Sequence, residues 1–209
     1  MIETLIFASC YVYSPKGTGE ICERSRLLRE LLKAGDARLL VKYASRVHQQ
    51  ATEATQLAGF FGADDVLVPV PRSSIKSCGM WVAADLADAL VFQGLGAIAW
   101  PGLRRVRAVC KSATAARGAR PSVDLHYASF SMVLPPPRTL DSVVLVDDVI
   151  TRGRTLLAAA ARVREALPAA RIRAFALLRT MGRVAEVNQL LRPCRGEIRW
   201  SGGDARRIP

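Results

Sequence analysis

The sequence predicts an α/β protein built on a parallel sheet. Two observations lead to this expectation: short runs of Val, Leu and Ile recur along the chain, and segments of helical composition separate them. With 209 residues, half of them apolar, the chain is long enough for one sizeable core and too short for two ordinary domains. We therefore expect a single domain.

Residues 1–64 are expected to form a mainly helical N-terminal extension. A short strand is predicted over residues 2–8, a turn over 13–19, and helices over 25–33 and 37–61. No repeat or low-complexity tract interrupts this part of the chain.

Residues 65–209 are expected to form the core, because strand and helix patterns alternate there. The predicted strands are residues 66–70, 126–133, 143–146 and 172–178, and the predicted helices are residues 79–92, 154–167 and 184–191. The chain after Pro193 is basic and irregular, with an edge strand predicted over residues 198–200. This order is typical of a parallel α/β sheet with a basic C-terminal tail.

Composition excludes several classes of protein. An apolar fraction of 50% is too high for a disordered chain, and the longest uncharged apolar run, residues 89–100, is too short for a membrane span. The five cysteines include no CxxC pair, so they predict neither a disulfide framework nor a two-pair zinc site. The N-terminus also lacks the basic start of a signal peptide, and we expect a cytoplasmic protein with reduced thiols.

The net charge favours an anionic partner. Lys and Arg number 30 against 18 Asp and Glu, which leaves a formal charge of +12. A field of this sign attracts nucleic acid, phosphates or an acidic partner.

The most informative segment is residues 143–155, VVLVDDVITRGRT. Four β-forming residues predict a strand buried on both faces, and Asp147 and Asp148 follow where open α/β sheets bind ligands. The loop then enters a helix, whose first backbone N–H groups favour an anion, and Gly153 permits close approach of the backbone. A phosphate cradle beside two carboxylates suits a ribose 5-phosphate, whose 2- and 3-hydroxyls would donate to the carboxylates directly or through a divalent ion. The alternative is an ordinary strand–turn–helix with a solvated acidic pair.

Residues 143–155 resemble, at every position, the fingerprint of the type I phosphoribosyltransferases. That family has a Rossmann-like core, binds 5-phosphoribosyl 1-pyrophosphate (PRPP) with Mg²⁺, and replaces the pyrophosphate by a nitrogen nucleophile, usually a nucleobase. The resemblance implies that Asp147 and Asp148 are catalytic residues that hold the ribose, with Mg²⁺ bound indirectly through the ribose or water. It further implies a set of 5-phosphate ligands: Thr151, Arg152, Gly153, Arg154 and Thr155.

Residues 66–72, VLVPVPR, resemble the strand and pyrophosphate loop of the ComF-type competence proteins, an amidophosphoribosyltransferase-like branch of the same superfamily. The resemblance implies that Arg72 and the N–H groups of Ser73 and Ser74 meet the pyrophosphate. Residues 78–80 depart from the Arg-Gly-Phe-Asn usual in that branch, and its N-terminal zinc-binding cysteine cluster is absent. The resemblance covers about residues 65–180. Taken alone, the segment also reads as a proline-rich turn.

A basic segment lies between the two motifs. Residues 89–123 contain six basic side chains and no acid: Arg104, Arg105, Arg107, Lys111, Arg117 and Arg120. Type I enzymes close a flexible loop over the site at this place, so the resemblance makes Lys111 the candidate catalytic residue that reaches the pyrophosphate, with Arg117 and Arg120 as further loop residues. The alternative is a solvated basic loop or a nucleic-acid contact surface.

No residue is an obvious general base. The only histidines, His48 and His126, are expected to be structural. The hood over the acceptor base could come from residues 1–64 or from the C-terminal tail, where Trp200 would either stack on a base or pack in the core.

The sequence therefore predicts a Mg²⁺–PRPP-dependent phosphoribosyltransferase that uses a nucleobase or another nitrogen acceptor. The alternative is a ComF-like, non-catalytic nucleotide- or DNA-binding protein linked to DNA uptake or processing. A small regulatory protein that binds a nucleotide and an acidic partner is a third class. DNA or RNA would bind the basic surface, especially the tail, and a homodimer is expected by analogy with type I enzymes.

Overall fold

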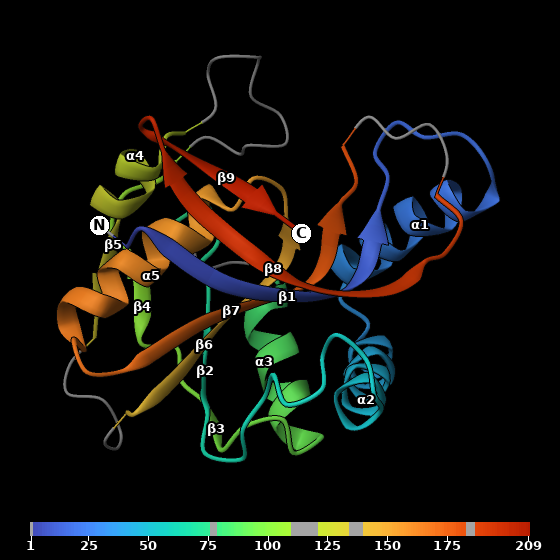
Figure 1. Ribbon diagram of the computed structural model, residues 1–209, viewed down its shortest axis with the longest axis horizontal. Coiled ribbons are helices and arrows are strands. Elements are labelled where there is room, and N and C mark those ends of the chain that lie inside the picture. Colours follow the sequence, from blue (N-terminus) through green and yellow to red (C-terminus); the bar gives the residue numbers. More distant parts are fainter. Residues whose placement is uncertain (1, 76–78, 110–120, 134–139, 183–186) are drawn as a thin grey trace.

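The computed structural model shows an α/β fold (Figure 1) and describes residues 2–75, 79–109, 121–133, 140–182 and 187–209. Its seven-stranded sheet has the order β3-β2-β6-β7-β1-β8-β9. These strands are β1 (Thr4–Tyr13), β2 (Val66–Pro69), β3 (Ile98–Ala99), β6 (Ser142–Ile150), β7 (Arg171–Thr180), β8 (Leu191–Ser201) and β9 (Asp204–Ile208). A two-stranded sheet pairs β4 (Leu103–Arg105) with β5 (Phe130–Met132).

The expected parallel sheet is present as the core of a mixed sheet. Strands β3, β2, β6, β7 and β1 pair in parallel, whereas β8 and β9 add an antiparallel hairpin beside β1. The central strands β6 and β7 are buried along most of their length, as their continuous apolar sequences predict.

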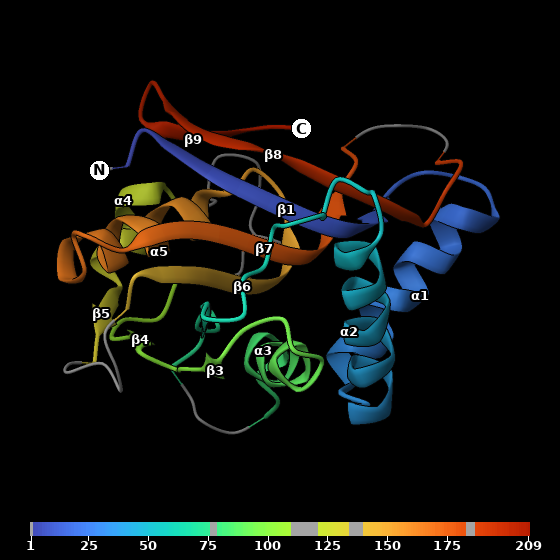
Figure 2. The same ribbon diagram turned by 60° about the horizontal axis from the view of Figure 1, so that its bottom comes forward.

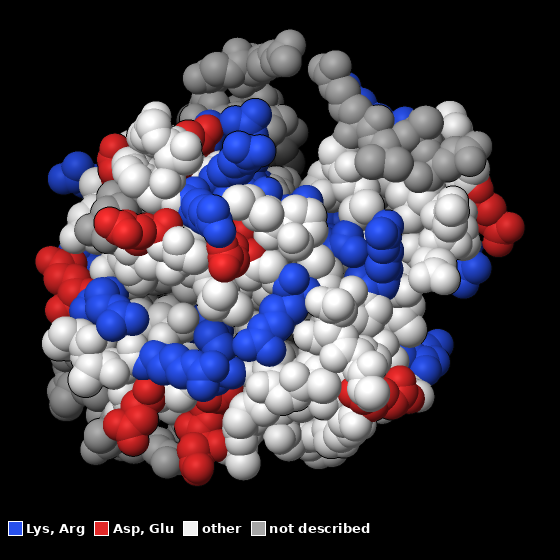
Figure 3. Space-filling view, viewed as in Figure 1, with Lys and Arg blue, Asp and Glu red and all other residues white. Residues whose placement is uncertain are grey.

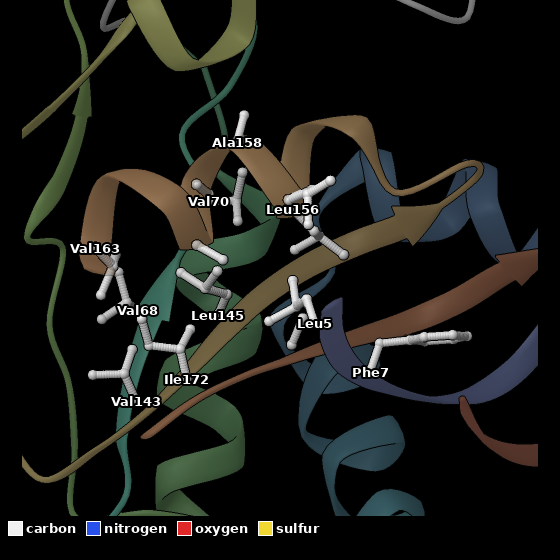
Figure 4. Packing of buried hydrophobic residues seen from close by; sticks show 14 of the residues in the cluster. Leu5, Phe7, Val68, Val70, Val143, Leu145, Leu156, Ala158, Val163 and Ile172 are labelled. Carbon is white, nitrogen blue, oxygen red and sulfur yellow. The ribbon is translucent and has the colours of Figure 1, made fainter. Parts of the chain in front are cut away.

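Helices cover both faces of the sheet (Figure 2). The helices are α1 (Glu20–Ala34), α2 (Ala37–Thr52), α3 (Val82–Phe92), α4 (Val123–Ala128) and α5 (Arg154–Ala166). Alternate residues of β6 serve the two faces: Val143 and Leu145 pack with α5, and Val144 and Val146 pack with α2 and α3. Figure 4 shows the first of these clusters, in which residues of α5 meet side chains from β1, β2, β6 and β7.

The two helix layers create a switch point between β2 and β6. These strands are neighbours, yet α3, which follows β2, packs on one face and α5, which follows β6, packs on the other. The loops that leave the carboxyl ends of the two strands therefore diverge. In open α/β sheets such a divergence opens the crevice in which ligands bind.

The N-terminal region differs from the expected helical extension. Strand β1 has ten residues rather than the seven predicted over 2–8, and it lies inside the sheet between β7 and β8. Residues 1–64 thus supply both a central strand and the helices α1 and α2, so the predicted boundary at residue 64 does not separate a helical extension from the sheet. Tertiary pairing made this strand longer than its local pattern indicates.

Two predicted elements in the second half are wrong in whole or in part. The strand predicted over residues 126–133 is found only over Phe130–Met132, as β5. Residues 126–128 belong instead to the short helix α4, whose first turn Ser122 caps by accepting from the Leu125 N–H at 3.1 Å. The predicted helix over residues 184–191 is also not found, since residues 187–190 are not helical and Leu191 begins β8. Residues 183–186 lie outside the described chain.

The basic tail is an ordered hairpin. The irregular segment predicted after Pro193, with an edge strand over 198–200, is instead the pair β8–β9, and β9 forms the edge of the sheet. None of the helices that the structure describes is long and apolar enough to cross a membrane.

Candidate functional site

Asp147 and Asp148 lie where β6 extends beyond β2. Pairing between these strands ends at Pro69 and Val146, whereas pairing with β7 continues, with Asp147 opposite Ala176. Strand β6 therefore does not end at Val146 as predicted, and both carboxylates belong to its last residues. Because the neighbour on one side has ended, the two side chains stand at the open edge of the switch point.

The environment of Asp147 opposes its negative charge. Burial raises the pKa of the Asp147 carboxyl well above its usual range, the adjacent Asp148 carboxylate raises it further, and Arg105 acts in the opposite direction. Each carboxylate accepts a 2.9 Å hydrogen bond from the next backbone N–H, Asp147 from Asp148 and Asp148 from Val149. The pair is consequently suited to partners that donate hydrogen bonds or carry positive charge.

The loop after β6 leads directly into α5. Gly153 is the N-cap residue, with φ of 88°, a left-handed conformation that favours glycine. Its carbonyl accepts from the Leu157 N–H at 2.8 Å and starts the helix. The helix that follows is 13 residues long, so its N-terminus presents its first backbone N–H groups and the positive end of a helix dipole to the loop.

One cavity of about 920 Å³ joins the two halves of the motif. Its lining includes Asp147, Asp148 and all five predicted phosphate ligands, residues 151–155. The remaining walls come from the end of β1, from α1, from the end of β7 and from β9; their charged members are Arg29, Lys33, Asp204, Arg206 and Arg207. We call this space the switch-point cavity. Its volume is in the range of small-ligand sites.

Asp204 of β9 is paired with both arginines of the loop. It accepts from the Arg152 guanidinium at 3.1 Å and binds Arg154 in a bidentate manner, through Nε and, at 2.5 Å, through Nη2. These hydrogen bonds raise the pKa of Arg154 and lower that of Asp204. The Asp204 carboxylate thus pairs with the two guanidinium groups that the sequence analysis assigned to a phosphate. The sequence carries no local signal for this contact, because its partners lie far apart in the chain.

The β8–β9 hairpin closes one side of the switch-point cavity. Arg207, half-buried, donates to the carbonyls of Ile150 and Thr180, at the ends of β6 and β7. Ile198 of β8 packs against Gly153. A Cβ atom added to Gly153 would lie 2.7 Å from the Cγ2 atom of Ile198. Trp200 is half-buried and packs against the core on the α5 face. The tail therefore belongs to the wall of the site.

The predicted pyrophosphate loop is held by Arg105. This buried side chain donates to the carbonyls of Arg72 at 2.6 Å and Pro71 at 3.4 Å, and it also bonds the Ser129 hydroxyl at 2.5 Å. Its guanidinium lies 4.3 Å above the Phe130 ring, and burial lowers its pKa to about 10. Arg105 thereby connects the loop after β2 to β5 and adds positive charge beside Asp147.

Arg72, Ser73 and Ser74 follow β2 at the switch point but do not line the cavity as the described residues delimit it. Arg72 donates to the carbonyls of Gly79 at 2.6 Å and Met80 at 3.2 Å. The Ser73 carbonyl accepts from the Val109 N–H at 3.0 Å. Lys111, Arg117 and Arg120 lie outside the described residues.

His126 is buried next to the first turn of α5. Its Nε2 lies 3.4 Å from the Thr155 hydroxyl, and its ring stacks on Phe130. Burial, together with the charges of Arg105 and Arg154, lowers its pKa to about 4. No described residue hydrogen-bonds its Nδ1. The sequence prediction of a structural role agrees with this burial, although the residue lies on a helix and not on a strand.

The carboxylate pair offers oxygen donors to a divalent ion. In the described part of the chain, no three His, Cys, Asp or Glu side chains gather as a self-sufficient metal site would require. Mg²⁺ prefers oxygen ligands and often completes its shell with waters and substrate phosphates around one or two carboxylates. Asp147 and Asp148 offer that donor set.

No protein-family model and no curated protein matches the chain. The chemical interpretation of the site accordingly depends on its geometry and on the sequence motif.

Sequence reasoning missed three residues of this neighbourhood. Asp204 and Arg207 were part of an apparently irregular tail, and Arg105 was one of several basic residues in a loop. A signal existed for Arg105 alone, since it lies two residues after Leu103, on the same face of a short strand.

Proposed function

We propose that the protein is a transferase that binds a ribose 5-phosphate in the switch-point cavity. More particularly, we propose a Mg²⁺–PRPP-dependent phosphoribosyltransferase that transfers the pentosyl group to a nitrogen acceptor, most simply a nucleobase, and releases pyrophosphate. The single observation that supports this best is the cavity itself, which joins two acceptor carboxylates to a helix N-terminus at a switch point.

In the proposed complex the 5-phosphate lies at the N-terminus of α5. Backbone N–H groups and the hydroxyls of Thr151 and Thr155 would donate to its oxygens. Arg152 and Arg154 would turn from Asp204 toward the phosphate. The ribose would then lie over β6, so that its 2- and 3-hydroxyls donate to Asp147 and Asp148.

The leaving group would lie toward the loop after β2, where the N–H groups of Ser73 and Ser74 and the side chain of Arg72 could meet it. As the C1–O bond breaks, its electron pair leaves with the pyrophosphate, and positively charged groups must stabilise that charge. Bound Mg²⁺ would supply Lewis-acid stabilisation of the same oxygens. Lys111, with Arg117 and Arg120, remains the sequence-based proposal for the loop that closes over this group.

Titration calorimetry with Mg²⁺–PRPP tests the proposal. The wild-type protein should bind, and Asp147→Asn/Asp148→Asn should weaken binding at least about ten-fold, since hydrogen bonds to charged groups contribute ~1.5–3 kcal/mol each. Asp141→Asn is the matched control, because Asp141 is exposed just before β6 begins, at the opposite end of the strand from the carboxylate pair. Absence of binding at millimolar PRPP, or equal binding by the double variant, contradicts the proposal.

Asp204→Asn is a second test, in which PRPP binding should become tighter instead of weaker. Removing the carboxylate releases Arg152 and Arg154 and removes a negative charge that would repel a phosphate. We expect PRPP to bind about two- to five-fold tighter, corresponding to ~0.5–1 kcal/mol for a partly exposed ion pair.

A second candidate function is nucleic-acid binding, which exposed arginines favour. Figure 3 shows Lys and Arg side chains gathered across one face of the molecule. Arg171 of β7 and Arg192, Arg195 and Arg199 of β8 are exposed. If nucleic acid is the ligand, DNA affinity falls steeply and linearly on a log–log plot against salt; a flat response counts against this candidate.

A further inference from the structure

A second cavity, of about 670 Å³, lies between α1, α2 and the ends of β1 and β8. We call it the α1–α2 cavity. Figure 2 shows the two helices next to each other at one end of the molecule. As far as the described residues define the two spaces, it shares no lining residue with the switch-point cavity. Its volume suits a small organic ligand.

Positive charge lines the α1–α2 cavity without an acidic residue among its described walls. Arg24 comes from α1, and Lys42 and Arg46, four residues apart on α2, share one helix face. The exposed carboxylate of Glu20 lies 3.8 Å from Arg24. Arg46 bonds a neutral partner, the Gln49 side chain, at 2.5 Å. No described carboxylate pairs with Lys42 or Arg46, so their charge is available to an anion.

Two tyrosines form an aromatic wall in the same cavity. The rings of Tyr11 and Tyr43 meet edge to face, with centroids 5.3 Å apart. Tyr11 is buried on β1, and no described residue hydrogen-bonds its hydroxyl, although it lines the cavity. Arg46 lies close enough to oppose the rise in the pKa of Tyr11 that burial causes, and Arg24 does the same for Tyr43. The cations and the rings therefore face a common space.

The remaining walls combine amides with apolar surface. Gln49 and Gln189 carry both donor and acceptor groups, and Ile21, Leu190 and Leu191 are apolar. A free inorganic anion would use the cations and leave the rings and amides without a role. A ligand that has a phosphate, a planar ring and polar ring edges matches all three kinds of wall.

We propose that the α1–α2 cavity binds a nucleoside monophosphate, with its phosphate on Arg24, Lys42 and Arg46 and its base against Tyr43. This site is separate from the proposed PRPP site and does not depend on it. Helix α1 contributes to both cavities, with Arg24 in one and Arg29 and Lys33 in the other.

Titration calorimetry of the full chain with AMP, and separately with inorganic phosphate, tests this inference. Lys42→Ala/Arg46→Ala should weaken AMP binding at least about ten-fold, because two charge-assisted interactions are lost. Both side chains are exposed, so the fold should persist. Lys16→Ala/Arg38→Ala is the control with the same change in net charge, from two exposed cations outside the cavity.

Two further variants identify the ligand and the location. Tyr43→Ala should weaken AMP but leave inorganic phosphate unchanged; equal effects on both, or phosphate binding as tight as AMP, would overturn the nucleotide assignment. Asp147→Asn/Asp148→Asn should leave AMP affinity intact, and its loss in that variant would place AMP in the switch-point cavity instead. AMP binding that survives Lys42→Ala/Arg46→Ala also overturns the inference, whatever the outcome with PRPP.

Discussion

His126 lies in a setting that excludes its charged form. Its ring is buried between Phe130 and Thr155, with the guanidinium groups of Arg105 and Arg154 close by, and its pKa is lowered to about 4 from 6.5. A cationic imidazole there would face two further cations without water. The neutral ring instead supports the hydroxyl of Thr155, a predicted phosphate ligand.

This depressed pKa predicts a loss of stability in acid. Below pH 6.5 the imidazole of His126 binds a proton in the unfolded chain but stays neutral in the folded chain. The free energy of unfolding therefore falls as the pH drops from about 6.5 to about 4. The shift corresponds to at most about 3–4 kcal/mol. Urea midpoints measured across this range should fall less steeply for His126→Gln than for the wild type.

Carboxyl groups titrate in both proteins, so their contribution to the fall in stability cancels when the pH dependence of the urea midpoint is compared between wild type and His126→Gln. The His126 ring can also be followed directly by NMR. A titration midpoint near 6.5, or parallel stability curves for wild type and variant, contradicts the prediction.

At the scale of elements, the β8–β9 hairpin and the start of α5 form one unit. Gly153 adopts a left-handed conformation and lies directly beneath Ile198, while Asp204 and Arg207 bind the loop and the strand ends. The hairpin thus positions the loop that enters α5, and this loop limits where the hairpin can lie.

Gly153→Ala should therefore lower the free energy of unfolding by more than backbone strain alone would. A left-handed residue other than glycine costs ~1–2 kcal/mol, and a methyl group 2.7 Å from Ile198 adds an overpacking cost of ~1–3 kcal/mol. We expect thermal unfolding to shift down by roughly 2–4 °C for each kcal/mol in a chain of this size.

Gly94→Ala is the matched control. Gly94 has a similar φ of 78°, and nothing lies within 4 Å of the point that its new methyl group would occupy, so only the first cost applies. Equal destabilisation by the two substitutions would show that contact between β8 and the loop contributes nothing.

At the scale of the whole molecule, a buried ion pair joins distant segments. Arg173 of β7 binds Asp65, just before β2, at 2.6 Å, the Ser142 hydroxyl of β6 at 2.9 Å, and the Phe60 carbonyl. Both charged side chains are almost fully buried. Three segments that enter the sheet separately are thereby connected at the amino ends of its central strands.

Arg173→Met should destabilise the protein by ~3–5 kcal/mol, because it leaves the Asp65 charge buried without its partner. Arg199→Met breaks a pair of similar length, 2.7 Å to Glu197, that is exposed, and should cost less than ~1 kcal/mol. Urea unfolding measures both. A loss of the same size in the two variants contradicts the argument from burial.

The local motif around Asp147 could be predicted from the sequence because its parts are consecutive in the chain. A run of apolar β-formers, a pair of acids and a Thr/Gly loop before an Ala-rich helix lead by short-range physics to strand, turn and helix. The same reasoning failed for residues 126–128 and for the tail, where a helix cap and long-range pairing decide the structure.

The sequence by itself thus determined the α/β class and brought Asp147 and Asp148 together with residues 151–155. The tertiary structure alone decided what surrounds them. Asp204 pairs with Arg152 and Arg154, Arg207 bonds the carbonyl at the end of β6, and Arg105 bonds the carbonyl of Arg72 in the loop after β2. The physical reason is distance along the chain. Asp204 and Arg207 reach the site only once β8 has paired with β1 and with β9. Arg105 bonds a carbonyl 33 positions away in the sequence, so no local pattern encodes either set of contacts.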